Sequence, residues 1–383
     1  MNSTVAIERC CDYSVSETSR AMRAAIQSID GLDFVKPGMR VGIKLNLVAA
    51  AKPERAATTH PELVCRLVEM LREKGAEVIL GDSPGGLYNE VALNHIYSVC
   101  GMNVAEKMGA KLNRNFGVVD GSYPEATIAK SFQYTSWLDQ CDAIINFAKL
   151  KSHGMMGMSC AAKNMFGVIP GVTKPQYHYR FPDINQFSDM ILDLDTYFKP
   201  VLSLVDAVVG MEGNGPTAGK PRPIGAILAS RDMHAMDLVC AAMIGLSKED
   251  VPTLQAAYRR GLIPEKADRI ATTNKISDYM VGDFETLETH NSLLFSDQVG
   301  GGKVGKLFEK LGSNVLRAQP KVHPQECIGC KQCKNVCPAK AITMENNIPV
   351  IARGKCIKCF CCQEFCPKGA IKVSKSLLMR LIK

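Results

Sequence analysis

From Cys327 the chain reads C-I-G-C-K-Q-C-K-N-V-C-P, and from Cys356 it reads C-I-K-C-F-C-C-Q-E-F-C-P. Both stretches follow the pattern C-x2-C-x2-C-x3-C-P. A shift of 29 residues maps the four cysteines and the proline of the first stretch onto those of the second. The C-terminal part of the chain is therefore an internal duplication organised around cysteines.

This cysteine spacing is typical of iron–sulfur ligation, because three closely spaced thiolates can surround one corner of a cubane cluster. Zinc sites also use C-x2-C pairs, and closely spaced thiols can form a redox relay. Neither alternative needs a third cysteine at the next step, a Cys-Pro pair, and the duplication of both features. The pattern therefore favours iron–sulfur clusters.

Over residues 321–373 the sequence resembles the bacterial ferredoxins that carry two clusters. The resemblance implies a small α+β domain with two [4Fe–4S] clusters, in which the cysteine before each proline binds the other cluster. By this resemblance the first cluster is held by Cys327, Cys330, Cys333 and Cys366. The second is held by Cys356, Cys359, Cys362 and Cys337. Cys361 is left over, and we interpret it as a non-ligand.

The chain has 383 residues and a formal net charge of +8, and 46% of its residues are hydrophobic. The length favours two or three domains, and the composition excludes a disordered or fibrous chain. The first residues lack the features of a secretory signal, and no apolar run is long enough for a transmembrane segment. We therefore expect a cytoplasmic protein, whose 16 cysteines do not form structural disulfides.

Positive charge is concentrated in the cysteine-rich part. Residues 320–383 contain 12 Lys+Arg and three Asp+Glu, whereas residues 1–319 contain 34 and 35. We do not expect a nucleic-acid-binding protein, because the basic residues are not spread over the whole chain. The predicted partners are redox enzymes with acidic docking surfaces, and the oligomeric state is left open.

The N-terminal part alternates short apolar runs with helical patterns. Strands are expected at residues 5–7, 41–47, 77–80, 143–147, 201–205 and 224–229. Helices are expected after the capping-box pattern Ser14-x-x-Glu17, from Pro61 to Gly75, and at residues 91–99 and 235–244. This alternation predicts an α/β fold with a mainly parallel sheet covered by helices on both faces.

Four segments are predicted along the chain. Residues 1–312 form the α/β domain, residues 313–324 a linker, and residues 325–373 the two-cluster domain. Residues 374–383 form an amphipathic tail, and a short helix is expected near residues 307–311.

Polar residues follow several of the expected strands. Ligands of parallel sheets bind beyond the carboxyl ends of the strands, so these residues predict a site for an anion such as a phosphate or a carboxylate. Its candidate residues are Lys44, Asn46, Lys149, Lys151, Lys163 and Asn164. Each lysine taken singly could instead lie on a solvated rim.

Four further residues are candidates for proton transfer or metal binding if the fold brings them together. They are His60, Asp82, His153 and Glu212. For His60 the alternative is a helix cap.

Seven short stretches resemble the family called domain of unknown function 362, whose members are often joined to a ferredoxin-like module. They are Ile43–Asn46, Thr59–Pro61, Gly81–Pro84, Lys149–His153, Lys163–Gly167, Glu212–Pro216 and Asp232–Asp237. The resemblance spans residues 3–245. It implies an architecture but no established activity.

Residues 213–218 read G-N-G-P-T-A and formally match a dinucleotide-binding fingerprint. That motif requires a helix whose N-terminus meets the pyrophosphate, and Pro216, Pro221 and Pro223 prevent such a helix. We therefore do not expect a nicotinamide cofactor at this loop.

Three functional hypotheses remain. The first is a low-potential, ferredoxin-like electron carrier of anaerobic metabolism, which is not itself an enzyme. The second is an iron–sulfur oxidoreductase that acts on an anionic substrate or cofactor in the lysine-rich cleft, and a cleft filled by side chains would contradict it. The third is an iron–sulfur scaffold or maturation factor.

Overall fold

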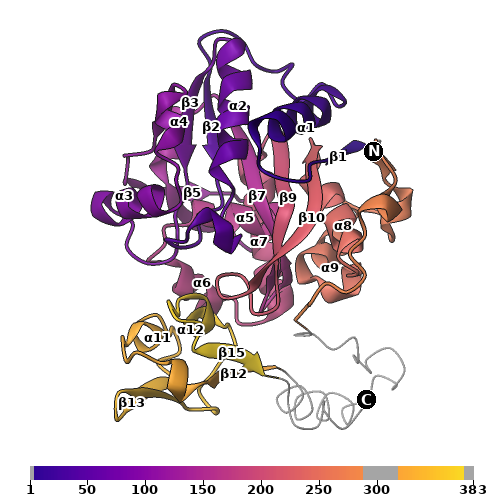
Figure 1. Cartoon of the computed structure of the whole chain (residues 1–383). Helices are drawn as coiled ribbons and strands as arrows, with labels where there is room; N and C mark the ends of the chain where they lie inside the picture. Colours follow the sequence, from indigo (N-terminus) through magenta and orange to yellow (C-terminus); the bar gives the residue numbers. More distant parts are fainter. Residues whose placement is uncertain (1–3, 288–317, 375–383) are drawn as a thin grey trace.

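The computed structural model describes residues 4–287 and 318–374 (Figure 1). Within these residues nine strands form one sheet in the order β11-β1-β10-β9-β7-β2-β3-β4, with β8 paired to β7. They are β1 (Thr4–Arg9), β2 (Arg40–Lys44), β3 (Glu77–Gly81), β4 (Ala110–Leu112), β7 (Ala143–His153), β8 (Gly157–Ser159), β9 (Leu202–Glu212), β10 (Lys220–Ser230) and β11 (Ala271–Thr272). Neighbours from β9 to β4 are parallel, and β10 is antiparallel to β1 and β9. The predicted mainly parallel α/β fold is confirmed.

Helices cover both faces of the sheet. One core contains residues of α1 (Val15–Gln27), α2 (Pro61–Glu73), α3 (Glu90–Val99) and α4 (Val104–Lys107). The other contains residues of α5 (Ala161–Met165), α6 (Lys174–Arg180), α7 (Ile184–Phe198), α8 (Met233–Met243) and α9 (Pro252–Arg259), and of the hairpin β5 (Val118–Ser122) and β6 (Ser131–Thr135). Alternation along a strand divides the side chains between the cores: Ala6 lies in the first, and Val5 and Ile7 lie in the second.

The ends of α2 lie where the sequence predicts them. His60 is the N-cap residue, and its Nδ1 accepts a hydrogen bond from the Glu62 N–H at 3.3 Å. Pro61 occupies the first turn, where its missing N–H costs no hydrogen bond. Gly75 follows the helix with φ of +79°, a conformation that favours glycine.

The predicted capping box of α1 is wrong, although the helix begins directly after Ser14. The Ser14 side chain makes no capping bond, and the Ser14 N–H donates to Asp12 Oδ1 at 2.8 Å. The Glu17 carboxylate instead accepts from the Arg20 side chain. In a capping box Glu17 would accept from the Ser14 N–H. Here Asp12 accepts that bond, and Glu17 is paired with Arg20.

The C-terminal module is a small α+β unit. Strand β12 (Gln319–Val322) pairs with β15 (Ile371–Ser374), and β13 (Ile342–Glu345) pairs with β14 (Ile348–Ile351). Two one-turn helices, α11 (Gln332–Asn335) and α12 (Cys361–Glu364), occupy equivalent places in the two halves of the duplication. Strand β12 lies within the stretch predicted as a linker, and the proposed domain boundaries remain predictions. The helix expected near residues 307–311 and most of the C-terminal tail lie outside the described residues.

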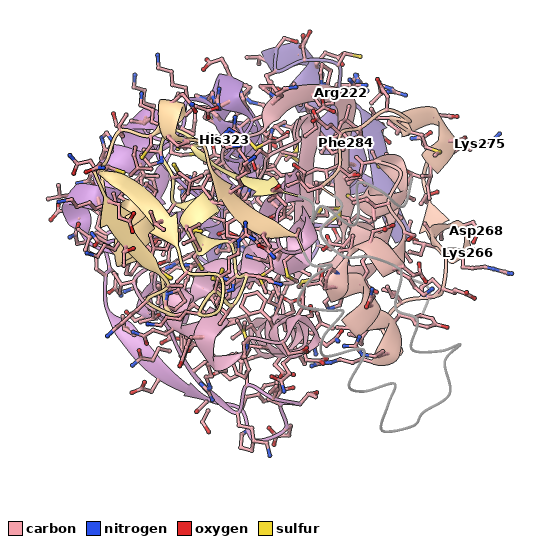
Figure 2. The ribbon with its side chains drawn as sticks, turned by 90° about the horizontal axis from the view of Figure 1, so that it is seen from below. Arg222, Lys266, Asp268, Lys275, Phe284 and His323 are labelled. Atoms are coloured by element: carbon pink, nitrogen blue, oxygen red, sulfur yellow. The ribbon has the colours of Figure 1, made fainter. Side chains whose placement is uncertain are left out.

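The module lies at one end of the sheet, with α12 facing the large domain (Figure 1). Seen from below, it covers one side of this end, and the segment that carries Lys266, Asp268 and Lys275 lies on the other side (Figure 2). No helix in the described parts of the chain is long and apolar enough to cross a membrane.

Candidate functional site

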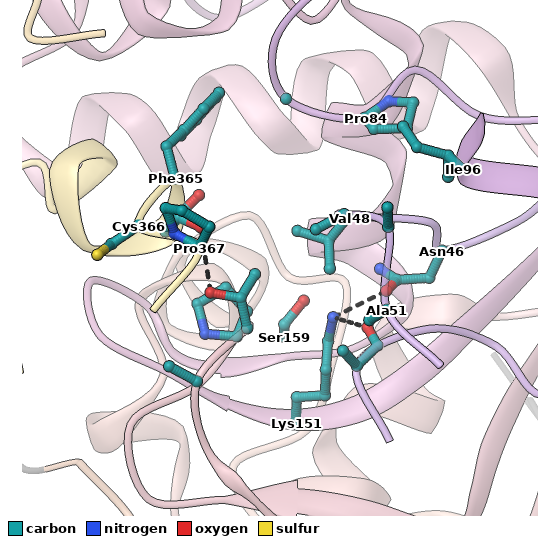
Figure 3. Close-up of a pocket in the computed structure, with 18 of the residues that line it drawn as sticks. Asn46, Val48, Ala51, Pro84, Ile96, Lys151, Ser159, Phe365, Cys366 and Pro367 are labelled. Carbon is teal, nitrogen blue, oxygen red and sulfur yellow. Dashed lines mark hydrogen bonds between the residues drawn. The ribbon is translucent and has the colours of Figure 1, made fainter. Parts of the chain in front are cut away.

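A cavity of about 990 Å³ lies between the end of the sheet and the module. The large domain lines it with residues that follow β2 and β3, at the carboxyl ends where the sequence analysis placed a ligand site. The module lines it with α12 and the residues after that helix. Figure 3 shows Phe365 and Cys366 on the left and Asn46 on the right, with Val48 and Lys151 between them.

Five of the six predicted anion-site residues line this cavity: Lys44, Asn46, Lys151, Lys163 and Asn164. Most of their polar atoms already have protein partners. Lys44 Nζ lies 2.7 Å from Asp82 Oδ1, and Lys151 Nζ donates to Asn46 Oδ1 at 2.8 Å. Asn164 joins this network through its amide oxygen, which accepts from Asn46 Nδ2 at 2.9 Å.

Lys149, the sixth predicted residue, does not line the cavity. Its ammonium lies 2.7 Å from Asp206 Oδ2 and donates to Tyr13 Oη at 2.9 Å. In a regular strand two residues this far apart would lie on the same face, but an irregularity in the pairing of β7 with β9 lies between Lys149 and Lys151. The Lys149 side chain is 1% exposed, so it belongs to a buried ion pair.

Burial shifts the pKa values of the lysines that line the cavity. It lowers the pKa of Lys151 to about 7, and the neighbouring charges of Lys149 and Lys163 add to the effect. It also lowers the pKa of Lys174 to about 7, against the attraction of Asp82. Burial lowers the pKa of Lys44 too, although the Asp82 carboxylate opposes the shift.

His153 joins the large domain to the module. Its Nδ1 accepts from the Met155 and Met156 N–H groups at 3.1 and 3.2 Å, which leaves the proton on Nε2. Nε2 lies 2.9 Å from Glu364 Oε1 of α12. Burial lowers the pKa of His153, so a neutral imidazole donates this bond. Burial raises the pKa of Glu364, but His153 and Lys163 outweigh it and hold that pKa at about 2.

The other three proton-transfer candidates have separate environments. His60 is stacked on Tyr13, with ring centroids 3.5 Å apart, and Glu212 accepts from the Glu285 N–H at 3.0 Å. Asp82 lines the cavity but is paired with Lys44. No three of His60, Asp82, His153 and Glu212 form a group that could hold a metal ion.

The polar residues of the cavity that the sequence analysis did not identify as ligand-binding candidates include Ser83, Lys174 and His178. Ser83 follows Asp82 at a strand end, and this position is the signal by which the sequence could have identified it as a ligand-binding candidate. Lys174 and His178 lie on α6, far from any strand end in the sequence, and only the packing of α6 brings them to the cavity.

Two smaller hollows in the module fit iron–sulfur clusters. The first is lined by four cysteines, Cys327, Cys330, Cys333 and Cys366. The second is lined by five, Cys337, Cys356, Cys359, Cys361 and Cys362, of which Cys361 is the predicted non-ligand. Apart from Cys361, each set contains three cysteines from one half of the duplication and the Cys-Pro cysteine of the other half. These are the two sets expected from the ferredoxin resemblance, so the residues present fit two clusters.

The hollows lie next to the large cavity. Cys366 lines both the first hollow and the cavity, and Cys361 lines both the second hollow and the cavity. Helix α12 is held against the large domain by Gln363, whose Nε2 donates to the Gly215 carbonyl at 2.9 Å. A Cβ atom at Gly85 would lie 2.3 Å from Phe365 Cζ, so the absence of a side chain permits this close approach.

The loop at residues 213–219 leads from β9 directly into β10, and no helix follows it. The rejection of a dinucleotide-binding helix is confirmed. This loop instead contacts the module, because Thr217 Oγ1 donates to the Glu364 carbonyl at 3.1 Å.

Comparisons with known proteins agree with this division of the chain. The family model described as domain of unknown function (DUF362) matches residues 41–242, and the model of a 4Fe-4S dicluster domain matches residues 319–367. A thylakoid-associated protein of Synechocystis sp. is 31% identical over 275 residues, which cover 70% of this chain and 83% of that protein. Formate hydrogenlyase subunit 6 of Escherichia coli is 46% identical over 33 residues, which cover 9% of this chain and only 18% of that subunit.

Among solved structures, the lactate racemase apoprotein from Thermoanaerobacterium thermosaccharolyticum aligns with 64% of this chain and 58% of its own, at a TM-score of 0.40 and 10% identity. A Thermotoga maritima protein aligns with 59% of this chain and 57% of its own, at a TM-score of 0.37 and 12% identity. The chain thus covers less than two thirds of either structure. The match over residues 41–242 and the Synechocystis relative show that the chain belongs to the DUF362 family, with a 4Fe-4S dicluster domain at its C-terminal end.

Proposed function

We propose that this iron–sulfur protein is an oxidoreductase, which transfers electrons between its cluster module and an anionic molecule bound in the large cavity. The observation that supports this most is the shared lining: Cys366, a proposed cluster ligand, lines the same cavity as Lys151 and Lys163. An electron carrier needs no enclosed site beside its clusters. Side chains of the described residues do not fill the cavity, so we favour the oxidoreductase over the carrier.

The charges around the cavity support an anionic ligand. Lys44 is neutralised by Asp82, and the Glu364 carboxylate is the other acid among the buried and half-buried residues of the wall. Lys151, Lys163 and Lys174 form no direct ion pair with a carboxylate among the described residues, although Glu364 attracts Lys163. A bound anion would compensate this excess of positive charge and raise the lowered pKa values of the lysines.

Two bound clusters would supply or accept single electrons. A two-electron reduction of the bound molecule therefore takes two electrons from an external reduced protein, and two protons from solvent balance the charge. The lysines bind and orient the anion, and Phe365, Pro84 and Ile96 exclude water from one side of the cavity (Figure 3). Lys151, with a pKa of about 7, can hold or release a proton at neutral pH.

Electron exchange with a separate protein is part of this proposal. Cys330 of the first cysteine set is exposed, so a partner can approach that cluster site from solvent. Cys366 of the same set lines the cavity.

The test begins with anaerobic purification and cluster reconstitution of the full-length chain. About eight irons and a coupled EPR signal after reduction are expected from two four-iron clusters. Anions released on denaturation are identified by mass spectrometry, and each is then mixed with the reduced protein while cluster reoxidation is followed.

We expect one released anion to reoxidise the clusters and to be recovered in reduced form. The variant Lys163→Gln should slow this reaction at least tenfold. Lys52→Gln, which removes an exposed charge from the rim of the same cavity, is the matched control and should change the rate less than twofold. About four irons, or reoxidation by proteins but by none of the anions, would contradict the proposal.

A further inference from the structure

Three polar groups on one wall of the cavity have no hydrogen-bond partner among the described residues. Ser83 Oγ and His178 Nδ1 are buried and unpaired, on side chains that are 1% and 3% exposed. Lys163 makes no hydrogen bond or ion pair there, and its ammonium instead lies 4.7 Å from the centre of the Phe166 ring. Unpaired buried donors are costly, so native proteins rarely keep them without a ligand or water.

The groups converge around one aromatic ring. The His178 ring centroid lies 5.6 Å from that of Phe166, and Lys174 Nζ lies 5.8 Å from it. Lys174 also donates to the Ser83 carbonyl, which ties the Ser83 loop to α6. These four residues, Ser83, Lys163, Lys174 and His178, are called the donor wall below, and all four line the cavity.

The donor wall differs chemically from the rest of the predicted anion site. Lys44, Asn46 and Lys151 are engaged in the buried network with Asp82 and Asn164. The donor wall offers a hydroxyl, an ammonium and an imidazole N–H, each able to donate, together with the second ammonium of Lys174. Its residues include no carboxylate. Lys174 already donates to the Ser83 and Ile169 carbonyls, and a bound anion would favour its protonated form. Two lysines and two neutral donors on one small surface then match a compact group with two negative charges better than a single carboxylate.

We propose that the donor wall is the subsite for a phosphate-type dianion of the ligand, with Ser83, Lys163 and His178 donating directly to its oxygens. This inference rests on the proposed function, because it names the chemical group by which the anionic molecule is held. The phosphate end lies against α6 and the Ser83 loop, which leaves the side of the cavity lined by Cys361 and Cys366 for the part of the ligand that reacts.

Binding of inorganic phosphate to the reconstituted full-length protein tests the subsite. Isothermal titration calorimetry under anaerobic conditions compares phosphate with sulfate, a second tetrahedral dianion, and with acetate. We expect phosphate and sulfate to bind at the same site in competition, and acetate to bind at least tenfold more weakly.

The variants Ser83→Ala and Lys163→Gln should each weaken phosphate binding about tenfold or more, while Lys52→Gln stays within twofold of the wild type. Ser83→Ala also separates binding from folding. It removes an unpaired buried hydroxyl, so the melting temperature of the protein without phosphate should stay the same or rise. A structural hydroxyl would give the opposite change in melting temperature.

The proposal is overturned if phosphate does not bind at millimolar concentration, if acetate binds as tightly, or if Ser83→Ala and Lys163→Gln both bind phosphate like the wild type. Phosphate binding does not depend on electron transfer. Normal phosphate binding without reoxidation of the clusters would therefore contradict the oxidoreductase but support the subsite. Reoxidation by an anion without phosphate binding would support the oxidoreductase but contradict the subsite.

Discussion

Individual lysines around the end of the sheet have different interaction partners, although their sequence contexts are alike. Lys149 and Lys151 are two residues apart on β7, and both are almost fully buried. Lys149 forms an ion pair with Asp206, whereas Lys151 donates to neutral oxygens. Lys163, without any such partner, is the lysine most available to a ligand.

Replacement of Lys149 should destabilise the large domain without changing anion binding. Lys149→Met leaves the buried Asp206 carboxylate without its cation, which should cost about 3–5 kcal/mol of unfolding free energy. Thermal unfolding should show a melting temperature lower by roughly 10 °C. The double variant Lys149→Met/Asp206→Leu removes both charges and should recover part of the loss. Weaker phosphate binding without a stability change would show that Lys149 belongs to the site instead.

Anion binding should weaken as the pH rises above 7. Lys174 has a pKa of about 7, lowered by burial and by Lys44 and Lys163 and opposed by Asp82 and Glu364. Its protonated form favours an anion, so binding raises this pKa and affinity is highest below pH 7. As the pH rises from 7 to 9, sulfate affinity should fall by up to about tenfold per pH unit for each proton taken up.

Sulfate titrations at pH 6.5, 7.5 and 8.5 check this dependence. Lys174→Met should bind sulfate more weakly at pH 6.5 and show a flatter pH profile. Lys151, whose pKa is also about 7, accounts for the dependence that remains. An affinity that rises with pH would contradict the assignment.

At the scale of elements, the two halves of the duplication have diverged in the residues that contact the large domain. The 29-residue shift places Gln363 and Glu364 of α12 opposite Lys334 and Asn335 of α11. Gln363 is fully buried against the loop at residues 214–215, and Glu364 pairs with His153. Lys334 and Asn335 are exposed. One half therefore docks on the sheet, and the other faces solvent.

Loss of the Gln363 side chain should loosen the module. Gln363→Ala removes the donor to two backbone carbonyls, of Asn214 and Gly215, and should cost about 1–3 kcal/mol. Hydrogen exchange of the loop at residues 213–219 should become faster. The equivalent change in the other half, Lys334→Ala, is the control and should leave that exchange unchanged. Equal effects of the two variants would mean that α12 does not hold the module.

At the scale of the whole molecule, the side of the module that faces the cavity differs in charge from the module as a whole. The cavity side of α12 is acidic at Glu364, whereas the module as a whole is basic, with 12 Lys+Arg and three Asp+Glu in residues 320–383. The exposed Cys330 belongs to the first cysteine set, so the proposed site of electron exchange lies on this basic module.

Electron transfer with an external partner should therefore depend on salt. An acidic electron donor should reduce the clusters more slowly as ionic strength rises from 0.01 to 1 M, because screening shortens the Debye length from about 30 to about 3 Å. Stopped-flow reduction by an acidic ferredoxin measures the rate. Reoxidation of the reduced clusters by a basic cytochrome, which accepts their electrons and should react slowly at low salt, is the control. A rate that does not change with ionic strength would mean that charge does not guide docking.

The sequence by itself determined the cysteine pattern of the module and the order of the elements. The C-x2-C-x2-C-x3-C-P pattern is local, and the cysteines it selects line the two hollows in the sets expected. Short apolar runs likewise predicted β3 and β7, because strands of a parallel sheet covered on both faces are buried along most of their length. Lys163 was also found, since it follows the strand ends closely in the chain.

Only the tertiary structure decided which polar groups meet. Asp206 lies 57 residues from Lys149, and Glu364 lies more than 200 residues from His153, so no local pattern could pair them. Ser83 and His178 became part of one wall because α6 packs beside the loop after β3. Periodicity reports which face of an element is buried, but contacts between distant elements depend on how the whole chain packs, and here that packing places the lysines beside the cluster module.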